Sequence, residues 1–133
     1  MVEDVLVIQP LAHEMIDAGA KLIELLDEQG FVIDAGMWLL MPEKGTWRLV
    51  LASPTVHRDG PRQAYRTIQL VLAKSAALPQ LSLANITVLD SADHIIQVLR
   101  KVAKTGPGIH SFRFTRNTVN GVHIPDAHIY RLT

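Results

Sequence analysis

The chain has 133 residues, 48% of them hydrophobic and 20% charged, so it is long enough for one domain with a sizeable core and too apolar to be disordered. It contains no cysteine, which excludes disulfides, zinc–thiolate sites, thiol nucleophiles and cysteine-held iron–sulfur clusters. No apolar run is long enough for a membrane-spanning helix. The acidic start MVEDVLVIQP lacks the basic residues with which a secretory signal begins. We therefore expect a cytoplasmic protein with no membrane contact.

The formal net charge of zero hides an uneven distribution. Residues 1–43 carry nine acids and one base, whereas residues 44–133 carry four acids and twelve bases. Such a division is typical of two complementary faces, within one fold or between subunits. It is also typical of a surface that binds anions or nucleic acid.

The first expected element is an amphipathic helix over residues 11–29. Apolar residues recur there at steps of three and four, polar residues fill the other side, and Gly30 follows as the C-cap. The apolar stripe predicts packing on the protein's own sheet, and a subunit seam is the alternative.

A hairpin over residues 37–53 is expected to form the centre of the fold. Its first arm, MWLLM, has no polar residue, which predicts a strand covered on both faces. Pro42-Glu43-Lys44-Gly45 forms the turn. In the second arm Trp47, Leu49 and Leu51 alternate with Arg48, Val50 and Ala52, so the two sets should face opposite sides of the sheet.

The sequence predicts a second helix over residues 62–78, with Asp59 as N-cap and Pro79 after its end. Residues 55–58 before it are expected to form a loop. A strand over residues 86–89 follows, and then a third helix that is capped by Ser91 and runs to about Lys104.

Two strands, residues 109–115 and 122–132, are expected to form a C-terminal ribbon, because Asn120-Gly121 is a strong hairpin turn signal. Pro125 should cause a bulge or mark an edge. The element order is α-β-β-α-β-α-β-β. We therefore expect a single α+β domain over residues 1–133, with three helices and a mixed sheet of about five strands.

The predicted ribbon register places polar residues together on one face. Arg113 lies opposite His128, Thr115 opposite Asp126, and Ser111 opposite Tyr130. The candidate ligand-binding residues of the ribbon are therefore Arg113, Asp126, His128 and Tyr130. This face is either a solvated outer surface or a site for an anion or for acid–base chemistry, in which Asp126 would orient His128.

Arg62 and Arg66 form a second candidate site. They lie four residues apart near the start of the second helix, where free N–H groups favour anions. Simple capping by Asp59 is the alternative explanation of this segment.

No pair among the six histidines has helical metal-ligand spacing, and His-Glu-x-x-His does not occur, so we expect neither a metal nor a cofactor. We find no complete catalytic constellation. The sequence favours a non-enzymatic, homo-oligomeric interaction module. The alternative is a binder of anions or nucleic acid, or a small hydrolase that uses the ribbon's polar face.

Overall fold

The structure, a computed structural model, describes residues 10–41, 43–75, 78, 81–119 and 121–133. Its order matches the predicted α+β fold, with one further short helix, α2. No helix in the described residues is long and apolar enough to span a membrane. The elements are α1 (His13–Glu28), β1 (Ala35–Met41), β2 (Thr46–Ser53), α2 (Pro54–Asp59), α3 (Pro61–Lys74), the 3-10 turn η1 (Leu83–Asn85), β3 (Ile86–Asp90), α4 (His94–Arg100), β4 (Phe112–Val119) and β5 (Val122–Leu132).

The five strands form one mixed sheet in the order β3-β2-β1-β5-β4. Only β2 and β3 are parallel; the other neighbours are antiparallel. The predicted central position of the MWLLM strand is confirmed, because β1 lies between β2 and β5 and is buried along nearly its whole length.

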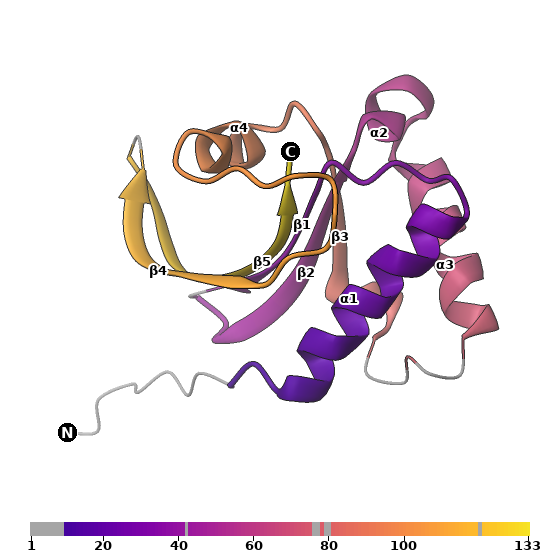
Figure 1. Cartoon of the computed structure of the whole chain (residues 1–133), viewed down its shortest axis with the longest axis horizontal. Helices are drawn as coiled ribbons and strands as arrows, with labels where there is room; N and C mark the ends of the chain where they lie inside the picture. The colour runs from indigo at the N-terminus through magenta and orange to yellow at the C-terminus, as the bar shows by residue number, and fades with distance from the viewer. Residues whose placement is uncertain (1–9, 42, 76–77, 79–80, 120) are drawn as a thin grey trace.

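Helices cover both faces of the sheet (Figure 1). Trp38, Leu49 and Leu51 face a cluster shared with α1 and α3. Met37, Val50 and Ala52 face a second cluster shared with α4, around which β4 and β5 curve. The predicted division of the second hairpin arm between two faces is therefore confirmed.

Helix α1 packs closely against the sheet at one glycine. A Cβ placed on Gly19 would lie 2.5 Å from the Tyr130 hydroxyl and 2.8 Å from Trp38 Nε1. Gly30 follows the helix in the left-handed conformation, with φ of 74°, which is the role predicted for it.

The predicted loop over residues 55–58 and the cap at Asp59 are wrong. Ser53 Oγ accepts a hydrogen bond from Thr55 N at 3.2 Å, and a proline follows Ser53 directly, so α2 begins where β2 ends. Asp59 ends α2 and pairs with Arg58. Gly60 precedes α3, which ends at Lys74. Pro79, the predicted helix stop, lies outside the described residues.

Helix α4 is shorter than predicted. Its N-cap is Asp93, whose Oδ1 accepts from Ile95 N at 3.1 Å, whereas Ser91 Oγ donates to Asp34 Oδ2 at 2.7 Å. The helix ends at Arg100 rather than near Lys104. The predicted cap is wrong because the Ser91 hydroxyl is hydrogen-bonded to Asp34, and Asp93, two positions later, caps the helix instead.

The C-terminal ribbon has the predicted register. Val119 pairs with Val122, Arg113 with His128 and Thr115 with Asp126. The β4–β5 register does not shift across Pro125, so the predicted bulge is absent from this ladder. Pairing of β5 with β1 begins only at Ala127, so Pro125 lies beyond the β1 ladder.

Candidate functional site

The structure brings Arg113, Asp126 and His128 together on one face of the ribbon, as the register predicted. Arg113 Nε and Nη2 donate to the two Asp126 oxygens at 2.6 and 2.7 Å. The guanidinium also lies 5.2 Å from the centre of the Trp47 ring, within the range of a cation–π contact. The hydrogen bonds that Arg113 donates to Asp126 raise the pKa of Arg113. A carboxylate of the chain itself therefore already fills the guanidinium fork that an anionic ligand would use.

His128 is not oriented by Asp126. Its Nε2 instead lies 2.9 Å from Ser111 Oγ, and only 7% of the residue is exposed. Burial and the positive charge of Arg113 lower the pKa of His128, because both disfavour the imidazolium. The histidine is thus held neutral in a partly closed environment, which differs from the expected solvated acid–base group.

Tyr130 belongs to the core rather than to an open polar patch. Its hydroxyl donates to Ile16 O at 2.5 Å and accepts from Trp38 Nε1 at 2.9 Å beneath α1. Burial raises the pKa of Tyr130. Its alternation with His128 placed it on the predicted face, but no local pattern in the sequence indicates that α1 covers this part of the face.

Arg62 and Arg66 do not join the ribbon residues. They are exposed on α3, and α3 and β4 lie at opposite ends of the molecule (Figure 1). Apart from the buried Tyr130, the predicted ligand-binding residues therefore fall on two separate surfaces.

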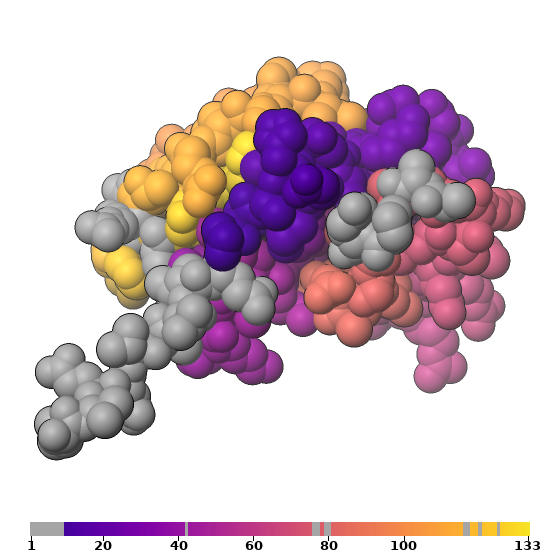
Figure 2. Space-filling view, turned by 90° about the horizontal axis from the view of Figure 1, so that it is seen from below, coloured from indigo at the N-terminus to yellow at the C-terminus, as the bar shows by residue number. Residues whose placement is uncertain are grey.

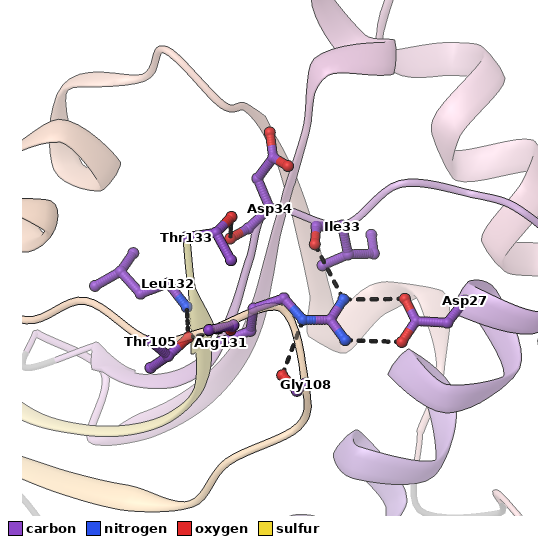
Figure 3. A network of polar contacts seen from close by, with 9 residues as sticks. Asp27, Ile33, Asp34, Thr105, Gly108, Arg131, Leu132 and Thr133 are labelled. Carbon is purple, nitrogen blue, oxygen red and sulfur yellow. Dashed lines mark hydrogen bonds and ion pairs between the residues drawn. The ribbon is translucent and has the colours of Figure 1, made fainter.

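A polar network missed by the sequence reasoning surrounds Arg131 (Figure 3). Its Nη1 and Nη2 donate to the Asp27 oxygens at 2.9 and 2.7 Å, and further bonds run to Ile33 O and Gly108 O. Arg131 is 5% exposed. The network joins α1, the segment before β1, the segment before β4, and β5, so it has a structural role. The only sequence signal was an arginine within the apolar end of β5.

A second missed cluster lies where the parallel strands β2 and β3 end. An open cleft of about 390 Å³ there is lined by Asp34, His57, Asp90, Ser91 and Arg100, among others. His57 Nδ1 lies 3.2 Å from Asp90 Oδ2, and Ser91 donates to Asp34. The serine and the histidine thus belong to separate pairs. In the described part of the chain no group of three or more His, Asp or Glu side chains could hold a metal ion.

The outer surface of α1 and α3 carries opposite charges on the two neighbouring helices, both of which reach the surface in Figure 2. Helix α1 has five acids and one base, whereas α3 has three bases and no acid. Within the ranges that the structure describes, Arg62, Arg66 and Lys74 form no ion pair, and neither do Glu14 and Glu28. The predicted charge division of the chain therefore becomes an acidic helix beside a basic one.

An apolar groove of about 240 Å³ runs between these helices. Its lining includes Leu25 from α1 and Leu70 and Val71 from α3, with Lys74 at its rim. Leu70 is 56% exposed, the highest exposure among the large hydrophobic residues of the described chain. Apolar side chains flanked by charged ones are typical of a protein-interaction surface.

Comparison of the chain with protein-family models, with curated proteins and with solved structures finds no match.

Proposed function

We propose that this protein is a cytoplasmic interaction module that self-associates through the outer surface of α1 and α3. The observation that carries the proposal is the pair of neighbouring helices with opposite net charges. In the described residues the three cations of α3 form no ion pair, and neither do two of the five acids of α1, Glu14 and Glu28. Helix α1 has a net charge of −4 and α3 a net charge of +3. A surface of this kind is complementary to a second copy of itself.

A two-fold dimer would use both charges at once. In such an isologous interface the same patch contributes from both subunits, so that each contact occurs twice. The acidic helix of one copy would lie on the basic helix of its partner, and the reverse pairing would follow by symmetry. Charge complementarity of this kind fixes the register and speeds association.

The groove between the helices supplies the apolar part of the proposed interface. Leu70 lies beside Leu25 and Val71. Because Leu70 is 56% exposed, burying it contributes about half of the 1.5–3 kcal/mol of a fully exposed leucine, or about 1–2 kcal/mol. Interfaces typically have such an apolar centre with a polar rim.

The alternative function, binding of anions or nucleic acid, has support only on α3. On the ribbon, Arg113 is already paired with Asp126. On α3, Arg62 and Arg66 are exposed, and a gel shift that weakens steeply with salt and is lost in an R62E/R66E variant would favour this alternative.

Sedimentation with charge-reversal variants tests the proposal. We expect the wild-type chain to form a species of twice its 14.7 kDa mass at micromolar concentrations, with the dimer weakening as salt screens the charges. R62E/R66E and E14K/E28K should each dissociate it. R62E/R66E changes the net charge of α3 from +3 to −1 opposite an acidic helix, and E14K/E28K raises that of α1 from −4 to 0 and places two cations opposite the basic helix. The combined variant should dimerise again, because the exchanged positions on the two helices would then carry opposite charges once more, with the signs reversed.

Leu70→Ser should also dissociate the dimer. The matched control is Val102→Ser, which changes another hydrophobic residue, 48% exposed, just beyond α4 and should leave the mass unchanged. A wild-type chain that stays at 14.7 kDa throughout would contradict the proposal. A combined charge variant that stays monomeric would contradict the pairing of α1 with α3.

A further inference from the structure

Helix α4 leaves part of its sheet face uncovered. It has seven residues and is therefore about 10 Å long, whereas the eleven residues of β5 extend about 36 Å. The uncovered part lies away from α1 and α3, on the other side of the sheet (Figure 1). It is separate from the proposed dimer surface.

A groove of about 350 Å³ occupies this uncovered part. Its walls are apolar and come from five elements: Leu39 and Met41 of β1, Val50 of β2, Leu89 of β3, Ile95 of α4 and Ile124 of β5. The volume lies within the range of small-molecule sites, which are mostly apolar with a few polar groups that fix orientation.

Arg48 lies at the edge of this groove and holds an uncompensated positive charge. Its Nε donates to Thr87 Oγ1 at 2.7 Å, Nη1 to Ala84 O at 3.0 Å and Nη2 to Ile86 O at 3.1 Å. All three acceptors are neutral, and within the described residues Arg48 forms no ion pair. The side chain is thus fixed in place without a carboxylate partner.

The guanidinium can still bind a ligand. Arginine has five N–H donors, and the three contacts above use one on each nitrogen, which leaves one on each terminal nitrogen. A fixed guanidinium prefers carboxylate or phosphate oxygens, and charge-assisted hydrogen bonds to them are about twice as strong as neutral ones. His123, which also lines the groove, has a further N–H donor on its ring.

We propose that this groove binds an amphiphilic carboxylate, with an aliphatic or aromatic body against Leu39, Met41, Val50 and Ile124 and its carboxylate on Arg48. The apolar walls define the body of the ligand, and the unpaired guanidinium defines its charge. The site stands on the opposite face from the dimer surface, so it does not depend on the proposed function.

Octanoate is a suitable probe, with 1-octanol, octylammonium and acetate as matched compounds that change the charge or remove the chain. We expect octanoate to shift the methyl NMR signals of Leu39, Met41 and Ile124 and to leave those of Leu25 and Leu70 unchanged. 1-Octanol should bind more weakly, and octylammonium and acetate should not bind at the same concentration. Equal binding of octanoate and octylammonium would overturn the proposal.

Arg48→Met keeps the length of the stem and removes the charge. It should weaken octanoate binding about tenfold, as expected for loss of a charge-assisted contact, and leave 1-octanol binding within about twofold. Arg58→Met, which changes an exposed arginine on α2, is the control and should change neither. Unchanged octanoate binding in Arg48→Met would refute the role of the guanidinium.

Ile95→Trp gives a second test that does not alter the polar contacts of Arg48. The side chain is partly exposed, so the larger ring can fill the groove, and binding of both octanoate and 1-octanol should be lost. If these methyl signals instead shift with protein concentration alone and octanoate has no effect, a second copy of the chain covers the groove and the ligand proposal fails.

Discussion

Gly19→Ala tests how closely α1 packs on the sheet. In an exposed helix interior alanine is favoured over glycine by about 1 kcal/mol. Here the new Cβ would lie 2.5 Å from the Tyr130 hydroxyl and 2.8 Å from Trp38 Nε1, and both side chains are almost fully buried. Overpacking of this kind costs about 1–3 kcal/mol, and displacing the hydrogen bonds of Tyr130 costs about 1 kcal/mol each. We expect a net loss of about 1–3 kcal/mol.

Urea unfolding followed by circular dichroism measures this loss, and a double-mutant cycle with Tyr130→Phe identifies its cause. The phenylalanine lacks the oxygen that the new methyl group would meet, so Gly19→Ala should cost at least about 1 kcal/mol less in that background. Gly30→Ala is the matched control. Its cost arises from a φ of 74° in open space and should be the same in both backgrounds. A stabilising Gly19→Ala, or an equal cost with and without the Tyr130 hydroxyl, would refute the reasoning.

Three further outcomes are expected. Asp27→Ala leaves the charge of Arg131 buried without a partner and should lower the free energy of unfolding by about 1–3 kcal/mol. This loss is smaller than that for breaking a fully buried ion pair, because Asp27 is 39% exposed. Glu28→Ala, one residue further on, is the control and should change the free energy of unfolding by less than about 0.5 kcal/mol. The pKa of His128 is lower in the folded state than its ordinary value near 6.5, so the unfolded chain binds more protons and stability should fall as the pH decreases below about 6.5. His128→Gln should flatten that dependence in urea titrations at several pH values, and an unchanged slope would contradict it. Asp93→Ala removes the N-cap of α4 and should lower the urea midpoint by the equivalent of about 1 kcal/mol.

The sheet was predictable where the sequence constrains it locally. An apolar run next to a turn containing glycine identified β1 as the central strand. In the ribbon, a two-residue turn makes Val119 pair with Val122, and each further pair in the ladder follows by counting outward from the turn. The side-chain period of a strand is two, so the same count also tells which residues share a face.

The caps and ion pairs were not predictable in the same way. Ser91 and Asp93 are both good capping residues, and the Ser91 hydroxyl is instead hydrogen-bonded to Asp34, 57 residues earlier in the chain. The partner of Arg131 is Asp27, 104 residues earlier in the chain. Such a contact depends on the arrangement of α1 against β5, which no local pattern specifies. The same arrangement buries Tyr130, although Tyr130 lies on the same face of β5 as the polar residues Asp126 and His128.

The pairing of β1 with β5 constrains how the protein is made. The β1–β2 hairpin can close as soon as residue 53 has left the ribosome, yet the other side of β1 stays open until residues 127–132 emerge. While the intervening segment is synthesised, β1, which has no polar side chain, has one backbone edge without hydrogen-bond partners. An exposed apolar edge strand of this kind promotes aggregation. At low translation rates the nascent chain should therefore depend on a chaperone that shields this strand until its last neighbour arrives.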